Sequence, residues 1–241
     1  MKARTIIPHL FLEAAPPLIQ IANMTDPNFF IESDRLYLCY FQPDDDSHCD
    51  FLVRLYNTAE FIASIGGNPT SITTREAARA LLAGRFRAEH ARNGYGTYLI
   101  LLKSRENDIS KDESVLPFPA RAARSTPVGT VSLMRGEPPN AYAAPDLGFA
   151  VLPEYCRRGI ATEASRALLE FVKREKDTSD VLGLFNPENI PSRGVFRRLG
   201  FEDRGERVLE VFGGITGAVY TLPGMSGDLS VYGLPDEKAV A

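Results

Sequence analysis

A short basic turn is the part of the sequence best suited to chemistry. The segment "PEYCRRGIAT" joins an apolar strand-like stretch, 146–152, to an amphipathic helix that begins near Ile160. At such a junction the first N–H groups of the helix have no intrahelical partner, and the helix dipole adds positive potential. Gly159 and Ala161 carry no bulky side chain that would block a close approach. The turn is therefore predicted to bind an anion, and a diphosphate would fit.

Other kinds of site are disfavoured by the residues present. Neither GxGxxG nor GxxxxGK[ST] occurs, which argues against a dinucleotide or a nucleoside triphosphate. The three cysteines, Cys39, Cys49 and Cys156, are odd in number and lack CxxC spacing, and the histidines are isolated. We therefore predict no metal and no disulfide framework, and a reducing, cytoplasmic location.

Charge and hydropathy exclude two further classes of partner. The formal net charge is -4 over 241 residues, whereas nucleic-acid binding rests on clustered Lys and Arg. No apolar run approaches the roughly 20 residues that span a bilayer. The sequence predicts neither a nucleic-acid partner nor a membrane anchor.

The elements that must position the turn alternate along the chain. Thr73 or Thr74 is expected to cap a helix that ends at Gly94, and another helix is expected to begin near Asp50. The segment 105–127 is expected to be a polar loop. Strands are expected at 34–41, 95–103, 128–134, 146–152, 180–186 and from 201, with a helix at 191–199 and one or two short strands in the tail. This order predicts an α/β fold with at least one parallel crossover.

Two segments together resemble a known family. "LGFAVLPEYCRRGIATEA" and "NPENIPSRGVFRRLGF" look like the acyl-CoA-binding core of the GCN5-related N-acetyltransferases (GNAT), most closely the bacterial ribosomal-protein N-terminal acetyltransferases RimJ and RimL. The resemblance covers Ile31 to about Phe212, with the turn, a Thr-Glu-Ala and an Asn-x-x-Ser helix in the family's order. The family's usual Gln or Arg at the first position of the turn is here Cys156.

The resemblance implies a fold and a donor. The expected GNAT fold is a mixed, twisted and mostly antiparallel sheet, splayed at its centre and flanked by helices, with acetyl-CoA between 146–152 and 180–186. Residues 1–30 would form an arm, 31–212 the acetyltransferase domain, and 213–241 strands and a tail that complete it. The implied cofactor-binding residues are Phe149, Ala150, Val151, Leu152, Arg157, Arg158, Gly159, Ile160, Ala161, Thr162, Asn189 and Ser192.

Acetyl transfer to an amine requires a base, because an amine with a pKa of about 10.4 is mostly protonated at neutral pH. Asp146 stands where relatives often have Glu and is the first candidate; Glu163 is the second, with a structural hydrogen bond as the alternative. Many relatives use a Tyr as the acid, but that position is Phe196 here, so Ser192 is the predicted substitute, or else a residue that bonds the helix backbone or Asn189.

Several alternatives stay open at this point. The predicted reaction is direct transfer of an acetyl group to a primary amine in a ternary complex, with a small-molecule amine slightly favoured and a protein N-terminus as the alternative acceptor. The competing hypothesis is an acyl-CoA-binding module without catalysis, and a third hypothesis places the N-terminal arm and the tail in an oligomer interface; a monomer or a homodimer is expected. A covalent route through Cys156 is disfavoured because no base is identifiable beside it. Arg197 and Arg198 could reach the nucleotide's phosphates, although an exposed helix face is the favoured interpretation.

Overall fold

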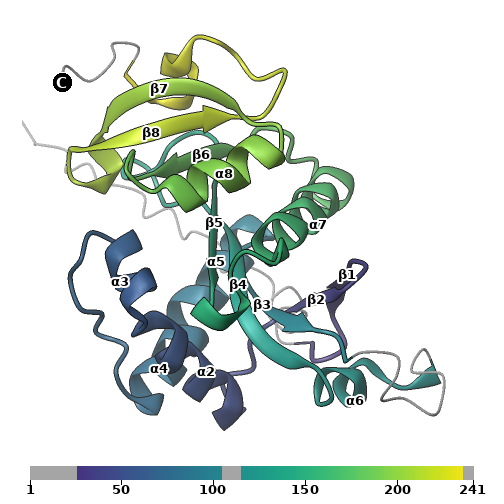
Figure 1. Cartoon of the computed structure of the whole chain (residues 1–241). Helices are drawn as coiled ribbons and strands as arrows, with labels where there is room; N and C mark the ends of the chain where they lie inside the picture. The colour runs from purple at the N-terminus through teal and green to yellow at the C-terminus, as the bar shows by residue number, and fades with distance from the viewer. Residues whose placement is uncertain (1–25, 105–114, 236–241) are drawn as a thin grey trace, which may run out of the picture.

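One twisted, eight-stranded sheet runs through the molecule (Figure 1). The structure is a computed structural model that describes residues 26–104 and 115–235, so most of the predicted N-terminal arm lies outside it. The strand order is β1-β2-β3-β4-β5-β6-β8-β7, and every neighbouring pair is antiparallel except β5 and β6. This confirms the predicted fold class. The strands are β1 (Phe30–Glu32), β2 (Leu36–Cys39), β3 (Thr97–Leu102), β4 (Thr126–Met134), β5 (Asp146–Val151), β6 (Leu182–Phe185), β7 (Glu202–Leu209) and β8 (Ile215–Thr221).

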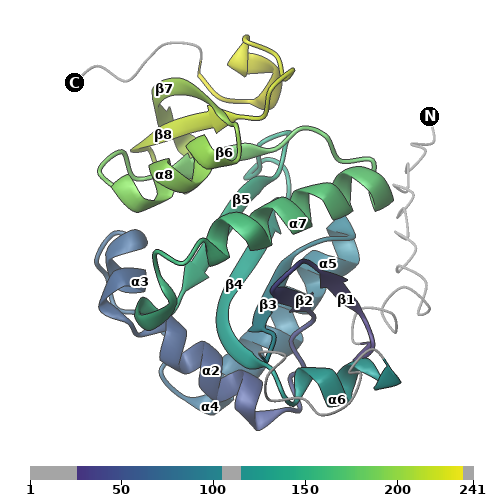
Figure 2. The ribbon, with the colours of Figure 1, turned by 45° about the vertical axis from the view of Figure 1, so that its right-hand side comes forward.

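Helices cover both faces of the sheet, as Figures 1 and 2 show from two directions. Buried residues of α7, among them Ala164 and Leu168, pack with strand residues such as Val131 in one core cluster. A second cluster joins α2 and α4 to the opposite face through Leu52, Ala78 and other residues. No helix within the described ranges is long and apolar enough to cross a membrane. The helices are α2 (Asp46–Tyr56), α3 (Ala59–Ser64), α4 (Arg75–Leu81), α5 (Arg87–Asn93), α6 (Phe118–Ala122), α7 (Ile160–Glu175) and α8 (Ile190–Arg198).

The helix bounds mostly follow local capping. Thr74 caps α4 by accepting from the Ala77 N–H at 3.2 Å, and Gly94 ends α5 in a left-handed conformation with φ 74°. The helix expected near Asp50 begins four residues earlier, at Asp46, because the Asp45 carboxylate caps it. The single helix expected before Gly94 is interrupted by a π-helical segment, Leu82–Phe86.

The prediction of a loop at 105–127 is partly wrong for the residues that the structure describes, 115–127. Residues Phe118–Ala122 form the short helix α6. The ring of Phe118 stacks on Phe30 with centroids 4.5 Å apart, and the Arg121 guanidinium lies 4.6 Å from the Phe30 ring centre. Phe30 belongs to β1, which is distant from α6 in the sequence. The residues around 118–122 therefore do not by themselves predict this helix.

The sheet separates into two parts between β5 and β6. These strands pair at one position only, Asp146 with Leu182, and the Leu182 N–H donates to the Pro145 carbonyl at 2.8 Å. The crossover through α7 makes them parallel, as predicted, and beyond this pair they diverge. The tail contributes β8, which lies between β6 and β7. The space beyond the Asp146–Leu182 pair is the splay.

Candidate functional site

The edge of β5 that faces the splay has unpaired backbone groups. The Leu152 N–H donates to Val128 at 2.9 Å, and in an antiparallel ladder alternate residues then bond the same neighbour. Ala150 and Leu152 therefore direct their backbone groups to β4, while Phe149 and Val151 direct theirs into the splay. On the splay side, β5 therefore presents the backbone groups of Phe149 and Val151, and of these the Val151 carbonyl accepts from the Cys156 thiol at 3.6 Å.

The basic turn follows at the end of β5. Its backbone is wound tightly, with left-handed conformations at Arg157 (φ 62°) and Gly159 (φ 78°), and α7 begins at Ile160. None of the N–H groups of residues 157–162 donates a hydrogen bond within the described part of the chain, whereas the Gly159 carbonyl already accepts from the Glu163 N–H at 2.9 Å. The turn thus presents unpaired donors and a helix N-terminus, the arrangement that binds diphosphates.

Glu163 holds the turn in place and is engaged in structural bonds. Its carboxylate accepts from the Ser33 hydroxyl and the Arg35 N–H, both at 2.8 Å, and from the Arg35 Nε at 2.7 Å. Arg35 Nη2 also donates to the Arg158 carbonyl at 3.1 Å, inside the turn. Burial works to raise the pKa of Glu163, but these hydrogen bonds and the Arg35 charge outweigh it and lower that pKa. The structural alternative considered for Glu163 is the one observed, and its carboxylate has little basicity to offer.

Breaking this contact is expected to loosen the turn. Arg35→Gln removes the guanidinium that joins Glu163 to the Arg158 carbonyl, so the affinity for the acetyl-CoA that the resemblance implies should fall about 10-fold, as for one lost charge-assisted hydrogen bond. The KM for the acceptor should stay unchanged. Steady-state kinetics with each substrate varied in turn would measure both, with Arg54→Gln, which breaks an exposed pair with Glu154, as the control. An acetyl-CoA KM equal to that of the wild type would contradict this role.

Asp146 lies at the inner end of the splay, where β5 and β6 still pair. Its side chain is half-buried and points to the face opposite α7, because residues alternate along a strand and Leu147 belongs to the α7 core. Burial raises the pKa of its carboxyl to about 7, and the negative charge of Glu89 adds to the rise, against a hydrogen bond to its own backbone. A carboxyl with this pKa can exchange a proton at neutral pH.

Helix α8 borders the other side of the splay. Asn189 caps it, because its Oδ1 accepts from the Ser192 N–H at 3.0 Å, and the Ser192 hydroxyl makes no hydrogen bond among the described residues. Of the alternatives considered for Ser192, the bond to Asn189 is present through the Ser192 N–H, whereas no bond of its hydroxyl is observed among the described residues. Phe196 is 1% exposed and stacks on Phe185 with centroids 5.0 Å apart, so it serves the core and has no proton to give.

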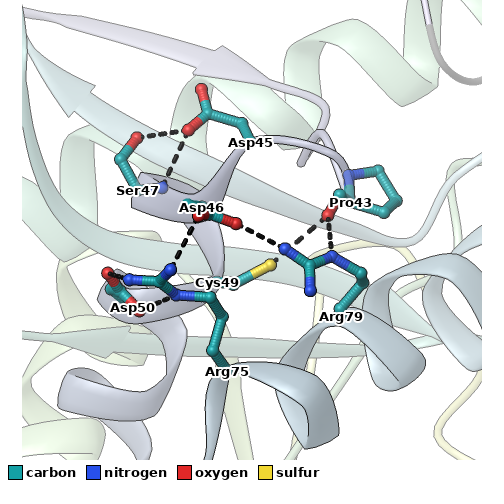
Figure 3. Close-up of polar contacts among 8 residues, drawn as sticks. All are labelled: Pro43, Asp45, Asp46, Ser47, Cys49, Asp50, Arg75 and Arg79. Carbon is teal, nitrogen blue, oxygen red and sulfur yellow. Dashed lines mark hydrogen bonds and ion pairs between the residues drawn. The ribbon is translucent and has the colours of Figure 1, made fainter.

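Arginine side chains of α4 join this helix to α2 (Figure 3). Arg75 on α4 donates to both oxygens of Asp50 on α2 at 2.7 and 2.6 Å, and to Asp46 at 2.6 Å. Arg79 bonds Asp46 as well, and its Nε donates to the Pro43 carbonyl at 3.1 Å. Asp46 and Asp50 of α2 are thus paired with arginines of α4, and these charge-assisted bonds join the two helices.

Cys156 does not have the environment of a nucleophile. Desolvation of its thiol, with the carboxylates of Glu60 and Glu154, raises its pKa in spite of Arg157. The thiol donates to the Val151 and Leu152 carbonyls at 3.6 Å. Because the thiolate is the reactive form, a raised pKa argues against the covalent route.

Two residues that act on the candidate site residues Glu163 and Asp146 were not predicted from the sequence. Arg35 reaches Glu163 over 128 positions of sequence, and no local pattern indicates that contact. Glu89 follows the π-helical segment, and its side chain is 12% exposed with one carboxylate oxygen buried and unpartnered. The widened helical turn before Glu89 is the one signal that could have drawn attention to it, and that turn is visible only in the structure. Within the described ranges, no three His, Cys, Asp or Glu side chains gather as metal ligands.

A family model and a curated relative both match this chain. The model is described as an acetyltransferase (GNAT) domain and matches residues 35–202. The relative is the uncharacterized N-acetyltransferase YnaD of Bacillus subtilis (strain 168), 33% identical over 60 residues, which are 25% of this chain and 35% of YnaD. The chain thus spans about a third of the length of that relative.

Solved structures share the fold at low sequence identity. The RimL ribosomal L7/L12 alpha-N-protein acetyltransferase in complex with coenzyme A is 22% identical, with a TM-score of 0.57 over 80% of this chain and 97% of that one. An acetyltransferase of the GNAT family from Bacillus anthracis is 18% identical, with a TM-score of 0.56 over 80% and 98%. The microcin C7 self-immunity acetyltransferase MccE, solved with acetyl-CoA and AMP, is 15% identical, with a TM-score of 0.57 over 78% and 92%.

Proposed function

The chain belongs to the GNAT acetyltransferase family, and from this premise we propose that it transfers an acetyl group from acetyl-CoA to a primary amine by direct attack in a ternary complex. One observation carries the proposal. A free strand edge and a turn of unpaired N–H groups lie on the same splay as a carboxyl with a pKa of about 7.

The donor would occupy the splay. Its diphosphate would accept hydrogen bonds from the N–H groups of residues 157–162, and its pantetheine amides would pair with the backbone of Phe149 and Val151, as an added strand pairs with an edge. The thioester would then lie near Asp146 and the start of α8. Asn189 and Ser192 remain our candidates beside the sulfur.

The chemistry is an addition and an elimination. The acceptor, as the free amine, attacks the thioester carbonyl carbon with its lone pair, and the Asp146 carboxylate accepts, directly or through a water, the proton that the attacking nitrogen loses as the N–C bond forms. The C–S bond then breaks, and the thiolate takes a proton either from solvent or from the Ser192 hydroxyl, which regains it from solvent. Holding both substrates in line supplies much of the rate. Glu163 is not proposed as the base, because its oxygens already accept from Ser33 and Arg35.

Ser192→Ala is expected to have a modest effect. A thiolate with a pKa of about 8.5 leaves without full protonation, so kcat should fall about 10-fold or less. The rate of CoA release at saturating substrates measures this, and Ser179→Ala, an exposed serine ahead of β6, is the control. A loss above about 1000-fold would mean that the leaving group depends on this hydroxyl far more than proposed.

The acceptor we favour is a small cationic amine. The negative charge of Glu89 acts on Asp146, and Arg85, whose Nε lies 3.6 Å from a Glu89 carboxylate oxygen, offsets part of that charge. The ionised Asp146 carboxylate would attract a cationic acceptor. A protein N-terminus is the second candidate, because solved relatives include ribosomal-protein acetyltransferases.

A panel of acceptors distinguishes these candidates. Acetyl-CoA and the full chain would be incubated with small polyamines and amino acids in one set, and with short peptides that have free N-termini in the other. Mass spectrometry identifies the acetylated product. We expect the higher kcat/KM in the small-amine set; a higher value for peptides would favour the N-terminal activity. Tight acetyl-CoA binding without any acetylated product would favour the binding module.

A further inference from the structure

Two arginines lie beside the start of α7 on the α8 side. The Arg198 Nε donates to the Thr162 hydroxyl at 3.4 Å, and Arg166 Nη2 donates to the Arg198 carbonyl at 3.5 Å. Thr162 and Arg166 are one helical turn apart and so share a face of α7. The Arg198 guanidinium also extends back over Gly194, where a Cβ would meet its Nη1 at 3.5 Å. Both arginines are therefore held at the junction of α7 and α8, next to the turn.

Neither arginine is neutralised. Within the described part of the chain, Arg166 and Arg198 form no ion pair with a carboxylate, and both side chains are exposed. The carboxylate of the adjacent turn, Glu163, is engaged by Arg35. Asp203 accepts from the Tyr220 hydroxyl at 2.8 Å, and the charges that act on it are those of Arg193 and Arg197. Two unpaired cations on neighbouring helices leave a local excess of positive charge, which an anionic ligand would offset.

We propose that Arg198, assisted by Arg166, binds the 3′-phosphate of the donor and so makes the protein select coenzyme A over its 3′-dephospho form. This inference rests on the proposed function. The N–H groups of the turn suit the diphosphate, and the 3′-phosphate is carried by the ribose joined to that diphosphate. A phosphate monoester is close to a dianion at neutral pH, and guanidinium groups bind phosphate through paired N–H donors.

The test removes the 3′-phosphate from the ligand and, separately, the guanidinium from the protein. Calorimetry on the full chain would compare CoA with 3′-dephospho-CoA for the wild type, Arg198→Gln and Arg166→Gln. The wild type should bind CoA about 10- to 100-fold more tightly, as expected for one or two charge-assisted hydrogen bonds. In Arg198→Gln, CoA should bind less than about 3-fold more tightly than 3′-dephospho-CoA. The affinity for CoA alone should fall, since the lost bond is to the 3′-phosphate, which 3′-dephospho-CoA lacks. Arg166→Gln should reduce it by a smaller factor.

Two control variants separate a specific contact from general charge. Arg174→Gln also removes one positive charge from α7, but the side chain it removes is paired with Glu175 at 2.7 Å. This variant should keep the wild-type ratio of affinities for CoA and 3′-dephospho-CoA. Arg198→Lys keeps the charge and should restore part of the discrimination.

The proposal fails if Arg198→Gln weakens both ligands equally, because the contact would then be to the diphosphate or to the fold. It also fails if the wild type binds both ligands equally. If the wild type binds neither ligand, the proposed function itself is wrong, so the two failures are distinguishable.

Discussion

Gly159→Glu is expected to abolish the binding of acetyl-CoA. Gly159 has φ 78° and lies between N–H groups that make no other hydrogen bond, and a Cβ there would meet Arg35 Nη2 at 3.5 Å, so a carboxylate at this position would put negative charge on the turn and compete for its donors and for Arg35. Placing like charges together costs several kcal/mol, which corresponds to a loss of more than about 100-fold in affinity. The left-handed backbone adds strain for any residue with a Cβ. Calorimetric titration with acetyl-CoA measures the loss directly.

The chain offers a closely matched control for that variant. Gly213 has the same φ of 78°, lies in the turn between β7 and β8, and has open space where a Cβ would be. Gly213→Glu adds the same charge and similar backbone strain away from the splay, so it should bind acetyl-CoA as the wild type does. Normal binding by Gly159→Glu would show that the diphosphate lies elsewhere. An equal loss in both variants would attribute the effect to strain or net charge.

Asp146→Asn is expected to lower kcat by about 10²- to 10⁴-fold, the contribution usual for a positioned base. The sign of the pH dependence follows from the raised pKa. Burial moves the pKa of Asp146 to about 7, so the carboxyl is protonated below pH 7 and unable to accept a proton, and it becomes a base above pH 7. The wild-type rate should therefore show an inflection near pH 7, and in the variant this inflection should be absent, leaving only the rise that comes from deprotonation of the acceptor amine. Initial rates between pH 5.5 and 9 would measure both effects.

Asp180→Asn is the control for this second variant. Asp180 precedes β6 as Asp146 begins β5, but its side chain is exposed, so the pH profile should match the wild type. The affinity of Asp146→Asn for acetyl-CoA should also be unchanged, since the carboxyl lies at the far end of the splay from the turn. A variant with wild-type rate and pH profile would mean that a water chain reaching other groups removes the proton.

The sequence predicted those parts of the site that depend on local structure. The unpaired N–H groups of the turn follow from a strand that runs directly into a helix, and Gly94 and Gly200 end helices where glycine permits a positive φ. The parallel relation of β5 and β6 follows from the helix between them.

Features that depend on distant contacts could not be predicted. The register between β4 and β5 decides which backbone groups of residues 149–152 point into the splay. A shift of one residue would turn the backbone of Ala150 into the splay in place of that of Phe149. The pKa of Asp146 depends on burial and on Glu89 from α5. The role of Glu163 depends on Ser33 and Arg35 from the turn between β1 and β2. Each of these is a tertiary contact without a sequence signature.

Acetyl transfer at the splay is tested by the release of free CoA from acetyl-CoA, followed with a thiol reagent in the presence and absence of amine. We expect release that depends on the amine, saturates with both substrates, and is strongly reduced in Asp146→Asn. Acetyl-CoA that binds in calorimetry but is never cleaved, whatever small amine or peptide is supplied, would contradict the claim that this splay catalyses acetyl transfer.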